Sequence, residues 1–144
     1  MYDFILKAHS GWAYIALIML IIAVVNALIG LSAKNPFTVK DRRISLMALL
    51  SVHIQFVFGL LLYFTSPNGF QKIQSVGMGG MSSMDRLLAL EHPAINLIAI
   101  ILITIGWSRH KRTADEKKFK TISICYGIGL LLLLSRIPWQ LWFA

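Results

Sequence analysis

The sequence predicts an all-α integral membrane protein that forms a single four-helix bundle. Hydrophobic residues make up 57% of its 144 residues, and the mean hydropathy of +0.70 lies far above that of soluble domains. Four long apolar stretches are predicted as helices, at about residues 4–32, 44–65, 87–108 and 121–143. Each exceeds the roughly 20 residues that a helix needs to cross about 30 Å of hydrocarbon. The connections are too short for a second domain, so residues 1–144 are expected to form one.

Local signals mark where the first two segments begin and end. The first has no small-residue cleavage site after a short apolar core, so it is expected to stay as a helix and not to be removed as a signal peptide. Asn35-Pro36 marks the turn that follows it. The second segment starts after Asp41-Arg42-Arg43 and stops at the turn signal Ser66-Pro67-Asn68-Gly69.

The last two segments carry their own signals. The third begins around Arg86, and Pro93 in its second turn should disturb at least one helical hydrogen bond because proline has no backbone donor. Trp139 and Trp142 near the end of the fourth segment are typical of an aromatic belt at the membrane surface.

The net charge of +8 is unevenly distributed and predicts the topology. Ten of the fourteen basic residues lie between segments one and two or between three and four: Lys34, Lys40, Arg42, Arg43, Arg109, Lys111, Arg112, Lys117, Lys118 and Lys120. The positive-inside rule makes these connections cytoplasmic and places both termini on the outer, periplasmic side of a bacterial inner membrane. The expected partner of the basic residues is therefore the lipid bilayer and not a nucleic acid.

Three histidines, His9, His53 and His92, lie inside the apolar segments. Lipid penalises ionisable side chains, so each is expected to serve a buried purpose. His9 follows Asp3 by six residues and His92 follows Arg86 by six, which places both roughly 9 Å inside the outer ends of their helices.

Helical periodicity groups polar and small residues on the faces that carry these side chains. His9 shares its stripe with Ala16, Ala23, Ala27 and Gly30, His92 with Asn96, and Arg136 with Gln140. Such faces normally point into the bundle. We therefore expect one haem between the helices near the outer face, with His9 and His92 as axial ligands. The single cysteine, Cys125, excludes both an internal disulfide and C-x-x-C-H attachment, so the haem would be of b type.

Other residues are predicted to complete this site. Arg136 would meet the anionic propionates, with Gln140 and Trp139 as further donors. Gly59, at a similar level on the second segment, would leave room for the porphyrin. Asn96 or Glu91 would orient an imidazole through its second nitrogen.

The remaining histidines and the methionines leave alternatives open. His53 lies nearer the middle of the bilayer, where it is either a packing residue or an alternative ligand paired with His92 or Met19. His110, among Arg109, Lys111 and Arg112, is expected in a solvated basic loop. The spacing of Met78, Met81 and Met84 in the outer loop would suit Cu(I), or else the methionines cover the interface.

Three short motifs give the chain a family resemblance: Lys7-Ala8-His9-Ser10-Gly11-Trp12, His53-Ile54-Gln55 with Gly59, and Glu91-His92-Pro93. With four helices and outward termini, it resembles the small bacterial cytochrome b-like membrane proteins. It resembles four-helix b-type cytochromes and haem A synthase halves more distantly. The resemblance spans essentially the whole chain and implies haem binding and electron transfer, with ligands at His9 and His92. The fourth segment has no histidine, unlike cytochromes that hold two haems.

The expected function is therefore one-electron transfer, by an electron-transfer protein or subunit more than by a stand-alone enzyme. Quinol, other membrane redox subunits and a second copy of the chain are the candidate partners. Two alternatives belong to other classes: a copper-handling membrane protein that uses the methionine loop, and a structural or assembly subunit without a cofactor.

Overall fold

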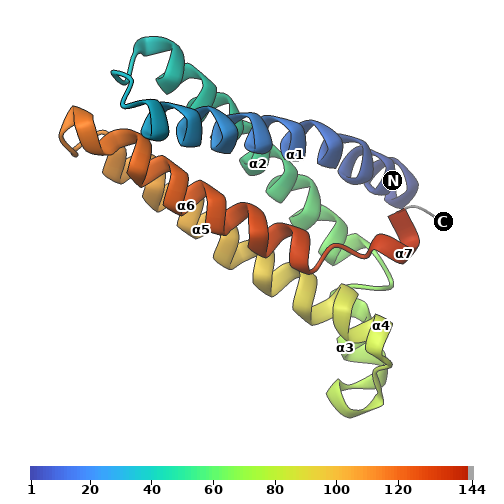
Figure 1. Ribbon diagram of the computed structural model, residues 1–144. Coiled ribbons are helices and arrows are strands. Elements are labelled where there is room, and N and C mark those ends of the chain that lie inside the picture. The colour runs from blue at the N-terminus through green and yellow to red at the C-terminus, as the bar shows by residue number, and fades with distance from the viewer. Residues whose placement is uncertain (143–144) are drawn as a thin grey trace.

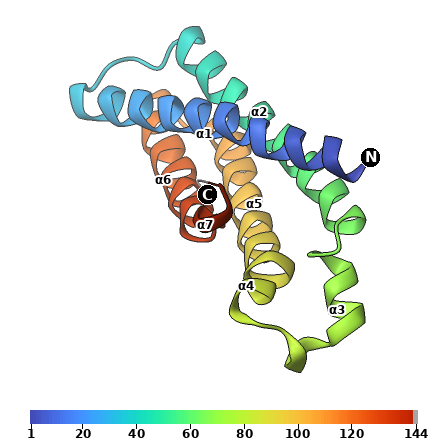
Figure 2. The same ribbon diagram turned by 90° about the vertical axis from the view of Figure 1, so that its right-hand side faces the viewer.

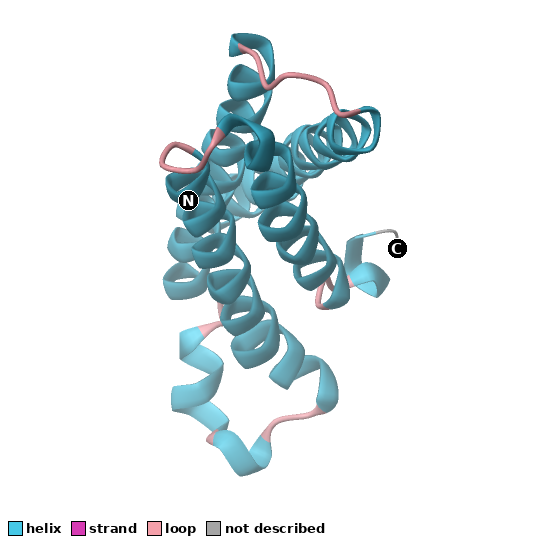
Figure 3. Cartoon of the chain, turned by 60° about the vertical axis from the view of Figure 1, so that its left-hand side comes forward, coloured by secondary structure: helices cyan, strands magenta, loops and turns pink. Residues whose placement is uncertain are grey.

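A computed structural model describes residues 1–142, and those residues are almost entirely helical and contain no strand (Figure 3). The long helices are α1 (Tyr2–Ala33), α2 (Val39–Thr65), α5 (His92–His110) and α6 (Asp115–Ser135). Together with short helical segments that continue α2 and precede α5, they give four spans long and apolar enough to cross a membrane. The all-helical prediction and its four spans are thus confirmed. The predicted end of the last segment, Phe143, lies outside the described residues.

The four long helices form a ring in which each packs on two neighbours. α1 packs on α2 and α6, and α5 packs on the same two helices (Figures 1 and 2). The α1–α2 and α5–α6 turns lie at one end of the bundle. The start of α1, the α2–α5 connection and the short helix α7 (Trp139–Trp142) lie at the other. α1 and α5 therefore face each other across a diagonal.

Small residues allow the helices to approach closely. Ala16, Ala23 and Ala27, which the sequence places on one stripe of α1, are at most 4% exposed. The aromatic ring of Phe119 on α6 covers Gly30 at the end of the same stripe. The hydroxyl of buried Tyr126 on α6 donates to the carbonyl of Ser45 on α2 at 2.9 Å. Van der Waals packing of this kind drives helix association where lipid removes the hydrophobic contribution.

The fourth span is shorter than the sequence predicts. α6 ends at Ser135, and Pro138 separates it from α7, because proline can neither donate the next backbone bond nor continue the helix. The free carbonyls at the end of α6 take side-chain donors instead. Trp139 Nε1 donates to Leu134 O at 3.2 Å, and Arg136 Nη1 donates to Ser135 O at 2.9 Å.

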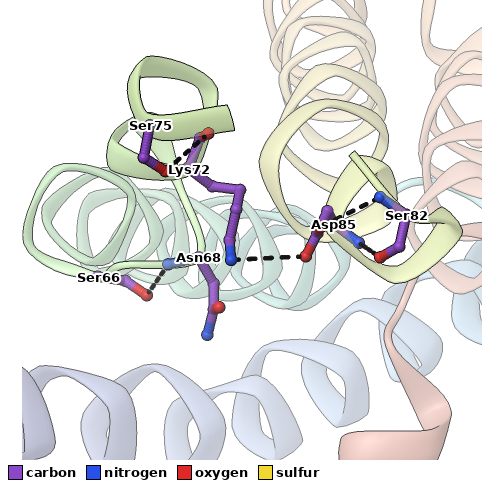
Figure 4. Close-up of polar contacts among 6 residues, drawn as sticks. All are labelled: Ser66, Asn68, Lys72, Ser75, Ser82 and Asp85. Carbon is purple, nitrogen blue, oxygen red and sulfur yellow. Dashed lines mark hydrogen bonds and ion pairs between the residues drawn. The ribbon is translucent and has the colours of Figure 1, made fainter. Parts of the chain in front are cut away.

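The connection between α2 and α5 is itself helical. It comprises α3 (Phe70–Val76), the single turn η1 (Met78–Gly80) and α4 (Ser83–Arg86). Ser82 and Asp85 cap the start of α4 reciprocally, and Lys72 of α3 pairs with Asp85 at 3.8 Å (Figure 4). Of these contacts, the Lys72–Asp85 pair is the one that joins α3 to α4.

His110 corrects a prediction. The sequence places it in a solvated basic loop, whereas its side chain is only 1% exposed. It forms the last residue of α5, where its ring packs on Trp107 at 4.6 Å and on Phe37 at 5.5 Å between centroids. Its Nδ1 lies 2.5 Å from Trp107 O, and Lys118 donates to the His110 carbonyl. The charged residues next to His110 in the sequence are exposed, whereas the His110 ring is buried at the end of the core.

The close approach of α5 and α6 at Gly106 can be tested directly. A Cβ at position 106 would collide with Cys125 Cβ, whereas a Cβ at Gly127 would meet nothing within 4 Å. Gly106→Ala should therefore lower the free energy of unfolding in detergent by about 1–3 kcal/mol. Gly127→Ala is the matched control and should be neutral or slightly stabilising. Equal unfolding midpoints for both variants would contradict this packing.

Candidate functional site

The bundle brings His9 and His92 together across its diagonal. Their ring centroids lie 6.1 Å apart and their planes are nearly perpendicular, at 89°. His9 belongs to α1 and His92 is the first residue of α5, so the pair lies near the end that holds the chain's start and α7. Two residues 83 positions apart in the sequence thus share one level, as their distances from the segment ends predict.

The His92 imidazole is held in one orientation. Its Nδ1 lies 2.8 Å from the backbone oxygen of Arg136. A carbonyl can only accept, so Nδ1 carries the proton and Nε2 keeps a lone pair. Asn96, one turn along α5, places its amide nitrogen 3.1 Å from Nε2. A ring with Nδ1–H on a carbonyl has the tautomer that metal-binding histidines use, and here its Nε2 lone pair accepts from the Asn96 amide.

Breaks in two helices produce this arrangement. The Arg136 carbonyl is available because α6 ends one residue before it. On the other side, a π-helical turn, η2 (Leu87–Glu91), leads directly into His92-Pro93. Pro93 has no N–H for the carbonyl of Ala89, and the hydroxyl of Tyr63 on α2 donates to that oxygen at 3.1 Å. π-helical turns are frequent at functional sites.

His9 is held from α2. The Gln55 side-chain nitrogen donates to the His9 carbonyl at 2.8 Å and lies 3.2 Å from His9 Nδ1. Gly59, one turn further, makes room for the ring, because a Cβ there would lie 3.1 Å from His9 Cε1. Gly59 was predicted to leave room for a porphyrin, and what it accommodates in the structure is the His9 imidazole.

Gln55 is the site residue that sequence reasoning did not assign. It appears in the motif His53-Ile54-Gln55. Its spacing could have identified it, because it lies four residues before Gly59 and so shares that residue's helix face. Only the docking of α1 on α2 places it against His9.

Two buried oxygen atoms beside the histidines have no partner. Among the described residues, Gln55 Oε1 and Asn96 Oδ1 are buried side-chain atoms without a hydrogen bond. Leaving such an atom unpaired in a protein interior costs about 1–3 kcal/mol. Each belongs to an amide that contacts one of the two imidazoles. The site therefore carries unused hydrogen-bonding capacity on both sides of the histidine pair.

The separation of the two rings is compatible with a metal held between them, and it is also an ordinary distance for rings that pack edge to face. A metal–nitrogen bond of about 2 Å and roughly 1 Å from nitrogen to ring centre would put the two ring centres about 6 Å apart across an iron atom. The observed centroid separation is 6.1 Å. No cluster of three or more His, Cys, Asp or Glu side chains occurs in the described part of the chain. The pair would supply two ligands to a metal, and any further ligands would have to come from another molecule.

Arg136 and its neighbours lie at the rim of this site. The Arg136 side chain is 47% exposed and its Nε lies 3.5 Å from the Glu91 carboxylate. Glu91 therefore contacts Arg136 in the structure, while Asn96 is the residue beside the imidazole. Gln140 is exposed on α7. Trp139 directs its Nε1 to the end of α6.

His53 lies apart from the pair and joins α2 to α5. Its Nδ1 donates to Leu49 O at 2.7 Å, and its Nε2 lies 3.3 Å from Thr104 Oγ1. Met19, its suggested partner, packs against the apolar core.

The three methionines do not share a surface. Met81 is 5% exposed and Met78 is 61% exposed, so the two side chains lie in different environments. Met84, on α4, is half-buried.

The Tyr63 hydroxyl provides a test of how His92 is held. Tyr63→Phe should lower the free energy of unfolding by about 1–3 kcal/mol, because the Ala89 carbonyl loses its donor. Tyr14→Phe is the control, since the described contact of Tyr14 is ring packing on Trp142 at 4.6 Å. Thermal unfolding in detergent measures both, and an unchanged midpoint for Tyr63→Phe would show that the bond does not stabilise this turn.

Comparison with protein-family models, with curated proteins and with solved structures found no match to this chain. The resemblance to cytochrome b-like proteins therefore stays a prediction, and the function has to be inferred from the site itself.

Proposed function

We propose that this protein binds one b-type haem between His9 and His92 and transfers single electrons in a bacterial inner membrane. The observation that supports the proposal is the histidine pair, 6.1 Å apart at the bundle diagonal, with His92 Nδ1 on a backbone carbonyl. The unpartnered oxygens of Gln55 and Asn96 border the same pair. Packing alone does not require two imidazoles at this spacing with amide groups left partly unsatisfied around them.

Haem would supply an iron centre that accepts and releases one electron. The protein's own residues have distinct tasks in this scheme. His92 offers Nε2 in a fixed orientation, because the Arg136 carbonyl holds its Nδ1 proton. Arg136 lies at the site's rim beside Glu91, and its side chain would be available to pair with an anionic propionate in place of that carboxylate.

His9 requires one adjustment before it binds iron through Nε2. Its Nδ1 faces the Gln55 amide nitrogen, which donates, so the proton of the neutral ring lies on Nε2. Binding through Nε2 would require that proton to move to Nδ1, and the donation from Gln55 to Nδ1 would then be lost. Reversing the Gln55 amide would not remove this conflict, because its nitrogen also donates to the His9 carbonyl at 2.8 Å, and Oε1 would then face that carbonyl.

Absorption spectra of the detergent-purified protein, oxidised and dithionite-reduced, test the haem site. We expect a Soret band and a sharp reduced α-band, both reduced about tenfold or more in His9→Ala and in His92→Ala because each change removes an axial ligand. His53→Leu is the matched control, since His53 contacts Leu49 and Thr104 and not the pair. A featureless spectrum after expression with ample haem, or full haem content in both alanine variants, would refute the proposal.

The charge distribution supports a topology in which the start of α1 and the α3–α4 region face the periplasm. In a Cys125→Ser background, Gly79→Cys should react in whole cells with a membrane-impermeant maleimide. Asn35→Cys should react only after the membrane is permeabilised. Both positions are exposed, so they differ in side and not in accessibility. The reverse labelling pattern would invert the proposed orientation.

A further inference from the structure

A second polar site lies in a groove between α2 and α5, away from the histidine pair. Its lining combines two polar side chains with apolar ones: His53, Phe56, Ile100, Ile101, Thr104 and Ile105. Ile101 and Ile105 are 50% and 43% exposed, so the groove opens on the outer surface of the bundle. These helices are long and apolar enough to span a membrane, and in a membrane that surface would face lipid.

The groove lies near the middle of the span. His53 follows the start of α2 at Val39 by 14 residues and precedes its end at Thr65 by 12. At 1.5 Å per residue it is roughly 20 Å from either end of the helix. Water is absent from the hydrocarbon core at this depth, so polar groups there need partners from the protein or from a lipid-soluble molecule.

The polar atoms in the groove include one more hydrogen-bond acceptor than there are protons to donate. His53 Nδ1 must donate to Leu49 O, 2.7 Å away, which leaves Nε2 as an acceptor. Nε2 lies 3.3 Å from Thr104 Oγ1. The single proton of Thr104 is also directed to Ile100 O, at the shorter distance of 2.7 Å. Nε2 of His53 is therefore an acceptor facing a lipid-exposed groove without a strong donor.

We propose that this groove binds the headgroup of a lipid-soluble hydroquinone. A phenolic O–H donates to His53 Nε2, the ring lies against Phe56, and the apolar tail follows Ile101 and Ile105 into the lipid. A donor at this depth has to be carried by an apolar molecule, whereas the hydroxyl groups of phospholipids stay at the membrane surface. The choice of hydroquinone over other lipid-soluble alcohols rests on the proposed electron-transfer function.

The position of the groove suits that function. His53 and Gly59 lie six residues apart on α2, or roughly 9 Å along the helix axis. Gly59 in turn contacts His9 of the proposed haem site.

The donor shortage also predicts a preference between redox states. A hydroquinone supplies the missing O–H, whereas the corresponding quinone brings only acceptors. A quinone must take the Thr104 proton away from Ile100 O in order to bind. The groove should therefore bind a hydroquinone more tightly than its quinone.

Anaerobic calorimetric titration of the protein in lipid nanodiscs, with decyl-hydroquinone and then decyl-quinone, tests this inference. We expect tighter binding of the hydroquinone, weakened about tenfold in His53→Leu, which corresponds to about 1.4 kcal/mol. Thr104→Val should keep hydroquinone binding within about twofold, because it removes the competing hydroxyl and leaves His53 Nε2 in place. Ile105→Trp should abolish binding by filling the groove without altering either polar residue.

Three results would overturn the site: equal affinity for the two redox forms, unchanged binding in His53→Leu, or unchanged binding in Ile105→Trp. The same experiments distinguish a failure of the proposed haem site from a failure of this groove. If hydroquinone binding depends on His53 in a protein with no Soret band, the groove stands and the haem proposal falls. A Soret band retained in His53→Leu, with hydroquinone binding lost, would show that this variant is folded and that the two sites are distinct.

Discussion

A carbonyl oxygen at the broken end of α6 holds the His92 imidazole, and the candidate site depends on that bond. The last carbonyls of a helix have no partner within the helix, and those at the end of α6 take donors from side chains. Trp139, Arg136 and His92 supply them. The last of these bonds leaves a single ring tautomer. The unpaired carbonyl at the end of α6 therefore determines which nitrogen of His92, on α5, carries the proton.

The two histidines of the pair are held by different means, and the difference has consequences. His92 is held by a backbone oxygen, which cannot change its role as an acceptor. His9 is held by the Gln55 amide nitrogen, which contacts both its carbonyl and its Nδ1. The neutral His92 ring therefore carries its proton on Nδ1, whereas the neutral His9 ring carries its proton on Nε2. The two imidazoles of the pair thus have opposite tautomers.

Charge is arranged differently at the two ends of the bundle. Both ion pairs between described residues, Lys72–Asp85 and Arg136–Glu91, lie at the end that carries the histidine pair. At the opposite end, Arg42 and Lys111 both approach the Trp107 ring, at 5.7 and 5.6 Å from its centroid. An aromatic face and the water boundary can accommodate these cations without acidic partners.

Hydropathy and helical period were enough to predict four spans, the small-residue stripe of α1 and the common level of His9 and His92. These properties are local, since they follow from residue type and from a rise and rotation that every α-helix shares. Pro93 was also predicted to disturb its helix, and it follows a π-helical turn. The same properties predicted an end of the fourth span that is too far along the sequence. They also predicted that His110 is exposed to solvent, whereas it is buried.

Long-range packing decided what periodicity could not. Gln55 reaches His9 only because α1 docks on α2, and His110 is buried only because Phe37 and Trp107 close over it. The Arg136 carbonyl meets His92 because two helix irregularities, far apart in the chain, fall at one level of the bundle. A hydrogen bond depends on atoms within about 3 Å of each other. No one-dimensional pattern specifies such distances until the helices have taken their relative positions.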